Sequence, residues 1–303
     1  MVLNERVLRL ILALAEELHF RRASARLHLS QPALSGTVKA LERDLGVRLF
    51  IRTSRNVQLT EAGQVLVAEA RHLLEQNDRA IALVRASCPD VMGPLRIGYS
   101  SSVDLQWLAA LIRRARRANF PADQFQFVSA EAPDLRSELV KGKLQAALLT
   151  GTQLDPDLET VALFREDFAV AVGPRHKWAR LPALQIDRLR DQPLIWLRRD
   201  VNPLLHDSVI AQLTTMGCQP RMSQEVSTYF ECLQFAHEGL GITFVPVSMK
   251  SRVHEGTVAF LRLGPRKLQI ECALAYLRGV KSTRLNRLVQ FVQAQVPHGK
   301  LAS

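Results

Sequence analysis

The stretch SQPALSGTVKALERDLGVRLFIRTSRNVQLT, residues 30–60, decides the fold of the N-terminal part of the chain. Its first half predicts a helix from about Gln31, because Ser30 is a favoured N-cap and Pro32 falls in the first turn, where its missing N–H costs nothing. Apolar side chains recur on one face of that helix: Leu34, Val38, Leu41 and Leu45. A face rotated well away from them carries Gln31, Pro32, Ser35, Gly36, Lys39 and Arg43.

This polar face is suited to the major groove of DNA. Gln31 can pair with an adenine edge at two points, and Ser35 can reach either base type. The cations that follow, Lys39 and Arg43, can meet phosphates. The helix therefore predicts a DNA-reading element. An ordinary solvated face is the alternative for this helix taken alone.

The second half of the stretch predicts a wing. Residues 46–60 form two short apolar runs that are typical of strands, with a turn at Thr53–Asn56 between them. Arg52 and Arg55 lie at this turn, where an arginine can enter a narrow minor groove or hold the DNA backbone. Upstream, an amphipathic helix is predicted over residues 5–18, with one apolar face made of Val7, Leu10, Ile11, Leu14 and Leu18. A short helix is predicted at about Arg22–Leu27.

A long helix is predicted from the N-cap Thr60 to near Pro89. One apolar stripe follows a strict 4-3-4-3-4 spacing through Leu66, Ala70, Leu73, Asn77, Ala80 and Val84. Val67, Leu74 and Ile81 widen this stripe. The pattern predicts pairing with a second chain, in which a buried Asn77 would fix the register. The alternative is a helix packed on its own domain, because the stripe is shorter than four heptads.

The overall charge favours a polyanionic partner. The 303 residues carry a net charge of +11 and have a pI near 10.1. The first sixty residues hold ten Lys and Arg against five Asp and Glu, whereas residues 61–90 hold three against five. The sequence also has no signal-peptide pattern and no apolar run approaching 18 residues, so we expect a cytoplasmic protein.

Motifs for metal binding and catalysis are missing from the sequence. The four cysteines, Cys88, Cys218, Cys232 and Cys272, form no CxxC pair, and the histidines lack HxxxH spacing. We therefore expect no structural metal and no cofactor. The sequence also lacks G-x-S-x-G and P-loop motifs, so we expect no enzymatic activity.

After a linker near Ser87–Gly93, the pattern changes to alternating strands and helices, which is typical of an α/β domain. A first βαβαβ unit is predicted at residues 94–100, 104–118, 125–128, 135–141 and 144–150. A second unit is predicted at residues 168–173, 193–196, 204–216, 222–226, 229–237 and 241–246. A strand at 268–276 and a helix at 282–295 complete the chain.

Ligands bind outside the carboxyl ends of the strands in such sheets. Ser100 and Ser102 follow one strand and lead into a helix N-terminus, where hydroxyls and free N–H groups would hold a carboxylate. The ends of two later strands, near residues 198 and 226, are further candidates. The alternative is that these serines and threonines are simply helix caps.

Residues 19–63, HFRRASARLHLSQPALSGTVKALERDLGVRLFIRTSRNVQLTEAG, closely resemble the winged helix-turn-helix of LysR-type transcriptional regulators. The shared signature is SQPALS…LE..LGV.LF.R……LTEAG. The resemblance implies base or groove contacts from Gln31, Pro32, Ser35 and Gly36, with Arg52 and Arg55 from the wing. The family often has Arg after that serine, so Gly36 predicts an altered or relaxed base preference at one position.

The remainder, to about residue 297, resembles the effector domain of the same family, which is similar to two-lobed periplasmic solute-binding proteins. The landmarks are LRIG, L..G, GPRHKW and GLGITFVP. The resemblance implies a small-molecule effector and a homodimer or tetramer. The hydroxyls and free N–H groups expected near Ser100 and Ser102 favour an organic acid as that effector. The effector contacts that it implies, with those predicted from the strand ends, are Ser100, Ser102, Val201, Asn202, Ser227 and Thr228. Related aromatic-acid responders often carry a hydroxyl where this chain has Ala132.

The predicted fold is therefore α/β with a winged helix-turn-helix at its N-terminus, a long dimerisation helix and a two-lobed effector domain. We expect a DNA-binding domain at 1–60, a linker helix and hinge at 61–92, and an effector domain at 93–303. Within the last, one subdomain covers 93–165 and 266–303, and the other covers 166–265.

Two alternatives to a ligand-controlled regulator are open. A redox signal could act through Cys218 and Cys232, although a reactive thiolate needs basic neighbours and only His237 stands near in sequence. A solute-binding protein or a small-molecule enzyme built on the two-lobed domain leaves the first ninety residues without a role.

Overall fold

The computed structural model describes residues 3–52, 56–86, 93–100, 102–103, 105–118, 125–151, 155–219, 221–265 and 267–295. The chain divides into two compact units, Met1–Ile81 and Ala82–Ser303. Each unit is described by itself.

The first unit begins with three helices, α1 (Glu5–Glu17), α2 (Phe20–Arg26) and α3 (Gln31–Leu45). The predicted start of α3 is confirmed, since the Ser30 hydroxyl accepts a hydrogen bond from the Ala33 N–H at 3.3 Å and Pro32 lies in the first turn. Buried side chains of the three helices, of the chain at the start of the wing and of the long helix that follows it form one core: Leu10, Ile11, Leu14, Phe20, Ala23, Leu34, Val38, Leu41, Leu49, Phe50 and Val67.

Two leucines that the helical pattern places in this core are instead exposed. Leu18 ends α1 in a left-handed conformation, with φ of 46°, and is 44% exposed. Leu45 is the last residue of α3 and is also 44% exposed, because the chain turns away at Gly46, where φ is 71°. Helical spacing therefore predicted burial wrongly at both helix ends, because the backbone there no longer follows the helix.

The wing consists of the antiparallel strands β1 (Phe50–Arg52) and β2 (Val57–Leu59), in which Phe50 pairs with Leu59. The predicted turn residue Arg55 lies outside the described residues. The helix α4 (Glu61–Ala86) follows. Its start is fixed by Thr60, whose hydroxyl donates to the Arg48 carbonyl at 2.7 Å and accepts from the Gly63 N–H at 3.0 Å.

Gly63 is required where α4 passes the end of the wing. A Cβ atom at this position would lie 2.1 Å from the Leu49 carbonyl oxygen. Any side chain here would therefore separate α4 from the strand that leads into the wing.

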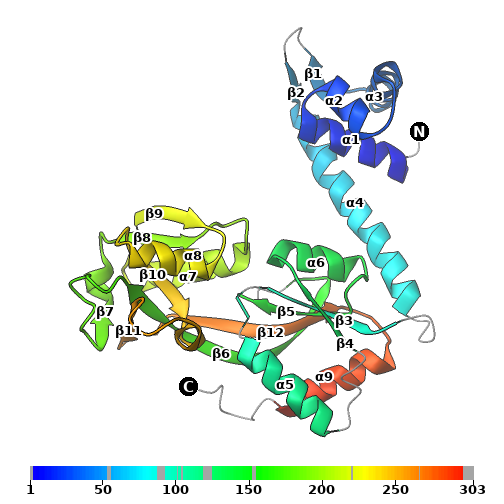
Figure 1. Cartoon of the computed structure of the whole chain (residues 1–303). Coiled ribbons are helices and arrows are strands. Elements are labelled where there is room, and N and C mark those ends of the chain that lie inside the picture. Colours follow the sequence, from blue (N-terminus) through cyan, green and yellow to red (C-terminus); the bar gives the residue numbers. More distant parts are fainter. Residues whose placement is uncertain are drawn as a thin grey trace. The chain divides into compact units, whose positions relative to one another are not determined.

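The second unit contains the predicted βαβαβ arrangement (Figure 1). Its elements are β3 (Leu95–Tyr99), α5 (Leu105–Arg117), β4 (Phe125–Ser129), α6 (Ala132–Val140) and β5 (Ala146–Thr150). The strand order is β4-β3-β5, and both pairings are parallel. The helix α9 (Thr283–Gln295) packs against α5.

Two long strands run through this unit, β6 (Leu158–Val172) and β12 (Gln269–Leu277). β6 pairs with β12 over Leu158–Asp167 and with two other strands over Phe168–Val172. Only residues 168–173 were predicted as a strand, because the preceding stretch LETVALFRED carries four charges. Pairing with β12 makes it a strand despite that composition.

The same sheet continues past the Phe168–Val172 half of β6. Its other strands are β7 (Ala183–Gln185), β8 (Pro193–Leu197), β9 (Arg221–Val226), β10 (Ile242–Pro246) and β11 (Ala259–Gly264). The helices are α7 (Pro203–Thr215) and α8 (Tyr229–His237), with 3-10 turns at Ile186–Leu189 and Val247–Arg252. β8 is parallel to β9 and β10, whereas β7 and β11 were not predicted. Trp196 lies at the centre of this core, with its ring in edge contact with Phe168 and Phe244.

Candidate DNA-binding surface and ligand sites

The two faces of α3 differ sharply in exposure. Leu34, Val38 and Leu41 are fully buried. Ser35 is half-buried, and the other members of the predicted DNA-binding face are exposed: Gln31, Pro32, Gly36, Lys39 and Arg43. A Cβ atom at Gly36 would have open space around it, so packing does not require glycine there. The helix thus presents a fixed polar surface that begins at its first turn.

Arg52 is held inside the first unit by three groups. Its guanidinium donates to the Ser35 hydroxyl at 2.9 Å, lies 3.6 Å from the Glu42 carboxylate and sits 4.4 Å from the centre of the Phe20 ring. The side chain is 28% exposed. Arg52 therefore joins the wing to α2 and α3, and the direct DNA contact expected of it stays a prediction.

Glu42 is a residue of this surface that the motif reasoning did not single out. One carboxylate oxygen accepts the backbone N–H groups of Leu49 at 2.9 Å and Phe50 at 3.1 Å. The other oxygen lies near Arg52. Glu42 thus fixes the angle between α3 and the wing. The acidic residue in the LE..LGV pattern is the signal that could have identified it.

The stripe on α4 has two parts. At its N-terminal end, Ala70 and Val67 are buried and Leu66 is half-buried, with Val67 and Leu66 packed in the core of the first unit. Further along, Leu73, Ile81 and Val84 are 44%, 41% and 69% exposed, and Asn77 and Ala80 are also exposed. Packing within the chain's own domain therefore explains the apolar residues of the N-terminal part of the stripe, but not those of the exposed part.

The predicted effector residues occupy two kinds of position. Ser100, Ser102, Val201 and Asn202 are buried, whereas Ser227 and Thr228 are half-buried. Asn202 caps α7 by accepting the Leu205 N–H at 3.1 Å, and Thr228 caps α8 by accepting the Glu231 N–H at 3.2 Å. The Glu231 carboxylate in turn accepts the N–H groups of Ser227 and Thr228. Asn202 and Thr228 therefore act as helix caps, which is the alternative role that the sequence offered for such residues.

Ser100 is different, because its hydroxyl has no partner in the part of the chain that the structure describes. Its Oγ atom is buried without a hydrogen bond, whereas the Tyr229 hydroxyl is buried close to Ser102. Burial raises the pKa of Tyr229 well above its ordinary value, so this hydroxyl stays protonated and able to donate. Unpaired buried hydroxyls are costly unless another group satisfies them.

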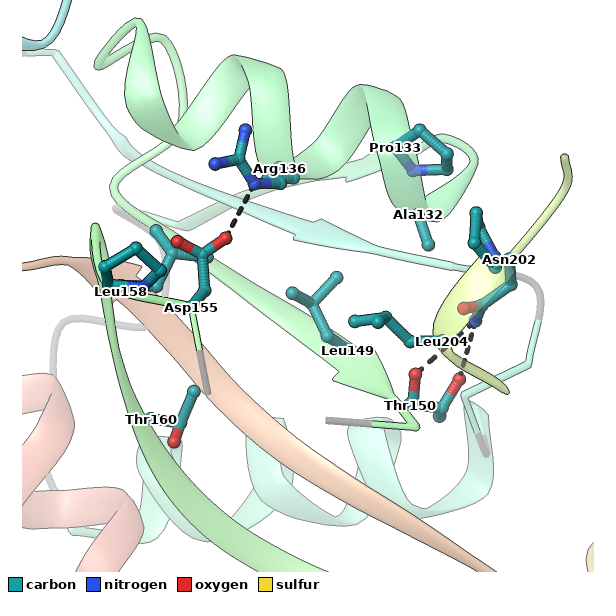
Figure 2. Close-up of a pocket in the computed structure, with 12 residues that line it drawn as sticks. Ala132, Pro133, Arg136, Leu149, Thr150, Asp155, Leu158, Thr160, Asn202 and Leu204 are labelled. Atoms are coloured by element: carbon teal, nitrogen blue, oxygen red, sulfur yellow. Dashed lines mark hydrogen bonds and ion pairs between the residues drawn. The ribbon is translucent and has the colours of Figure 1, made fainter. Parts of the chain in front are cut away.

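A cavity of about 350 Å³ lies where β5, α6 and the start of α7 meet (Figure 2). Its described lining is mainly apolar, with one ion pair and three neutral polar residues: Ala132, Pro133, Arg136, Leu149, Thr150, Asp155, Pro156, Leu158, Thr160, Asn202, Pro203 and Leu204. Asn202 is the one member of the predicted effector set in this described lining. Ala132, which the family resemblance compares with a hydroxyl of aromatic-acid responders, also lies in this lining. The other lining residues were not predicted, because they come from separate segments of the chain.

The cysteines considered for redox sensing are buried. Cys218 and Cys232 are free thiols, as is Cys272, while Cys88 lies outside the described residues. Burial raises the pKa of Cys218, and it raises the pKa of Cys232 to about 12. Both shifts oppose formation of the thiolate that reacts with oxidants.

Within the described ranges, no group of three or more His, Cys, Asp or Glu side chains could hold a metal ion. The helices of the same ranges include none that is long and apolar enough to span a bilayer.

Each of the two units is similar to a domain of known proteins. The model of the bacterial regulatory helix-turn-helix protein, lysR family, matches residues 6–64, and the LysR substrate binding domain matches residues 90–297. The regulator AlsR of Bacillus subtilis is 29% identical over 295 residues, which cover 96% of this chain and 95% of AlsR. The dual regulator OxyR of Escherichia coli is 30% identical over 244 residues, which cover 80% and 79% of the two chains.

A solved structure is also similar along the whole chain. A full-length variant of OxyR from Pseudomonas aeruginosa has a TM-score of 0.56 and 26% identity, over 100% of this chain and 97% of that one. The two family models together cover most of the 303 residues. The chain therefore belongs to the LysR family and is a DNA-binding transcriptional regulator with an effector-binding domain.

Proposed function

We propose that this regulator reads its operator with the exposed face of α3. Gln31, Pro32 and Ser35 meet base edges at the N-terminal end of the helix. Lys39 and Arg43, with Arg52 and Arg55 of the wing, meet phosphates or the minor groove. The single observation that carries the proposal is the position of this polar face opposite the fully buried Leu34, Val38 and Leu41.

The exposed part of the α4 stripe supports a homodimer. Leu73, Asn77, Ala80, Ile81 and Val84 would pair with the same residues of a second chain. A dimer would present two α3 helices to two half-sites of a palindromic operator. Two such dimers would form the tetramer that the family resemblance implies.

The effector is an organic acid that binds near Ser100 and Ser102, at the start of α5. The support is the buried Ser100 hydroxyl without a partner among the described residues, in the segment that precedes α5. A helix N-terminus favours a carboxylate. Val201, Asn202, Ser227 and Thr228 complete the predicted site from the β8–α7 and β9–α8 connections. Control of DNA binding by this acid requires no cofactor and no catalysis, and because the chromosome is the target, the protein acts in the cytoplasm.

A redox signal is the second candidate, because curated relatives about 30% identical are named hydrogen peroxide-inducible genes activators. The burial of Cys218 and Cys232 and the raised pKa of each thiol favour the ligand-controlled function instead.

The experiment that tests the proposal is binding-site selection with the purified protein, with and without a panel of small carboxylic acids. We expect a palindrome with two half-sites and a footprint that shortens with one acid. Lys39→Ala should weaken operator binding, whereas Lys281→Ala, a change of an exposed lysine in the other unit, should not. Ser100→Ala should remove the response to the acid, with Ser129→Ala as the control.

Selection of no preferred sequence would contradict the role of α3. A footprint that responds equally in Ser100→Ala would contradict the position of the acid while leaving the DNA-binding surface in place.

A further inference from the structure

The Ser35 hydroxyl belongs to the polar face of α3 and is also bound by a side chain of the wing. The Arg52 Nη1 atom donates a hydrogen bond to Ser35 Oγ at 2.9 Å. A guanidinium has donors only, so the serine oxygen must be the acceptor in this pair. Ser35 is half-buried, so its hydroxyl can bind Arg52 and still be reached from the surface of the helix.

The proton of this hydroxyl has no acceptor among the residues that the structure describes. A hydroxyl inside a helix can donate to the carbonyl four residues earlier. Thr37 of the same helix does so, since its hydroxyl donates to the Ala33 carbonyl at 3.0 Å. Ser35 makes no corresponding bond to the Gln31 carbonyl. The Ser35 O–H therefore remains available to an acceptor outside the protein.

Arg52 is itself held in one orientation. Its guanidinium lies 4.4 Å from the centre of the Phe20 ring, and its Nη2 atom lies 3.6 Å from the Glu42 carboxylate. That carboxylate is fixed in turn, because it accepts the backbone N–H groups of Leu49 and Phe50. A guanidinium that turned away from Ser35 would disturb the contacts to Phe20 and Glu42. The hydrogen bond to the serine oxygen is therefore preorganised before DNA binds.

A cation that donates to a hydroxyl changes what this hydroxyl binds well. Hydrogen bonds in a chain polarise one another, so donation from Arg52 makes the Ser35 O–H a stronger donor. The positive charge also repels a second N–H group that approaches the same oxygen, which weakens its remaining lone pair as an acceptor. Ser35 is therefore suited to an acceptor atom on a base edge and poorly suited to an amino group.

We propose that Arg52 is a positioning residue that makes Ser35 read its base as a hydrogen-bond donor, so that the operator base facing Ser35 is not cytosine. In the major groove, cytosine presents an amino donor, whereas guanine, adenine and thymine each present an acceptor. The inference rests on the proposed function, in which Ser35 meets a base edge, and adds the class of base that Ser35 selects. It also gives Arg52 a part in sequence recognition that does not require Arg52 to touch a base.

The base preference can be measured directly on the full-length protein. Each of the four bases is placed in turn at every position of the half-site obtained by binding-site selection, and affinity is measured by fluorescence anisotropy. The position that Ser35 contacts is the one at which Ser35→Ala changes the preference. There the unmodified protein should bind cytosine about tenfold more weakly than the best other base, and Ser35→Ala should lose this penalty. Thr37→Ala, which removes a hydroxyl already donated within α3, is the control and should keep it.

Substitution of Arg52 tests its part in this preference. Arg52→Met removes the donor and the charge but keeps an apolar chain against Phe20, so the Ser35 oxygen can accept the cytosine amino group and the penalty should disappear. Arg52→Lys keeps a cationic donor and should keep most of the penalty. Arg48→Met, at an exposed arginine whose side chain has no partner among the described residues, should leave it unchanged. A purely structural role of Arg52, or a phosphate contact, would change the affinity for all four bases alike.

Three results would overturn the proposal: cytosine bound as well as the other bases at the position of Ser35, no position at which Ser35→Ala changes the preference, or an unchanged cytosine penalty in Arg52→Met. Circular dichroism identifies a variant that fails to fold, and the first two results require no substitution of Arg52. Selection of no preferred sequence by the unmodified protein would contradict the proposed function as a whole. A selected operator without a cytosine penalty at this position would leave that function in place and remove this inference alone.

Discussion

The DNA-binding surface and the ligand cavity are built in opposite ways. Five of the six residues that form the polar face of α3 are exposed on that one helix, and one hydrogen-bonded carboxylate, Glu42, fixes the helix to the wing. The cavity is lined by residues from β5, α6, β6 and α7 together with the connection at residues 155–156. Function that lies on one helix can be predicted from periodicity, whereas function enclosed by several elements depends on their packing.

The largest effect should come from removing the residue that fixes α3 to the wing. Glu42→Ala deprives the Leu49 and Phe50 N–H groups of their acceptor, which should cost about 2 to 3 kcal/mol of stability in the first unit. Hydrogen exchange at these two amides and chemical denaturation measure the loss. Glu42→Gln keeps an acceptor oxygen and should cost less. Equal losses in the two variants would mean that the charge, and not the hydrogen bonds, fixes the wing.

Gln31→Ala should weaken operator binding by about 1 to 3 kcal/mol and relax the preference at one base pair, because a bidentate contact to a base edge is lost. Fluorescence anisotropy with operators that vary at each position measures both effects. Arg43→Ala, a phosphate contact, should instead weaken binding to all sequences alike. A uniform loss for Gln31→Ala would place this residue at the DNA backbone.

Substitution of each wing arginine should distinguish a residue that stabilises the fold from one that contacts DNA. Arg52→Ala removes contacts to Ser35 and Phe20 and should lower the free energy of unfolding by about 1 kcal/mol. Arg55→Ala should leave stability unchanged and reduce the salt dependence of operator binding by about one phosphate contact. The converse pattern would show that Arg52 leaves its internal partners when DNA binds.

Asn77→Leu should tighten self-association, because an apolar residue replaces an amide in the expected seam. Sedimentation velocity measures the dimer affinity and any change in stoichiometry. Leu73→Asp, which places a charge in the same stripe, should weaken association. If neither substitution changes association, the exposed part of the α4 stripe is not the dimer interface.

The smallest effect is expected at the buried thiols. Because burial raises the pKa of Cys232 to about 12, it stays a thiol at about pH 8, so iodoacetamide should label it far more slowly in the native than in the unfolded protein. A Cys88→Ser background removes the one cysteine outside the described residues. Cys218→Ala/Cys232→Ala should keep its operator binding and its response to signal. A lost response would restore the redox candidate.

The raised pKa of the Cys232 thiol also predicts how stability changes with pH. The pKa of Cys232 is higher in the folded protein than its ordinary value of 9.0, so its contribution to stability is complete below about pH 9. Above that pH the unfolded chain loses the proton first, and the contribution decreases as the pH rises toward 12. Denaturation from about pH 8 to about pH 11 should therefore show a smaller loss of stability in Cys232→Ala.

Elements that depend on interactions between residues close in sequence were predicted correctly, whereas those that depend on distant segments were not. Ser30, Pro32 and the leucines of α3 predicted that helix correctly, because capping and periodicity act within a few residues. The predicted burial of Leu18 and Leu45 was wrong because the chain leaves the helical path at each end. The N-terminal part of β6, residues 158–167, was missed because its pairing with β12 joins segments that are distant in sequence.

The sequence by itself determined the family, the winged helix-turn-helix, the polar face of α3 and the α/β character of the larger unit, because each rests on local patterns or on a specific motif. Only the tertiary structure decided that Arg52 is bound by Ser35 and Glu42, that Asn202 and Thr228 act as helix caps, and that the Ser100 hydroxyl is buried without a partner in the described chain. It also formed the cavity and paired Arg136 with Asp155. The physical reason is that a side chain's partners and its access to water are set by whichever distant segments pack around it.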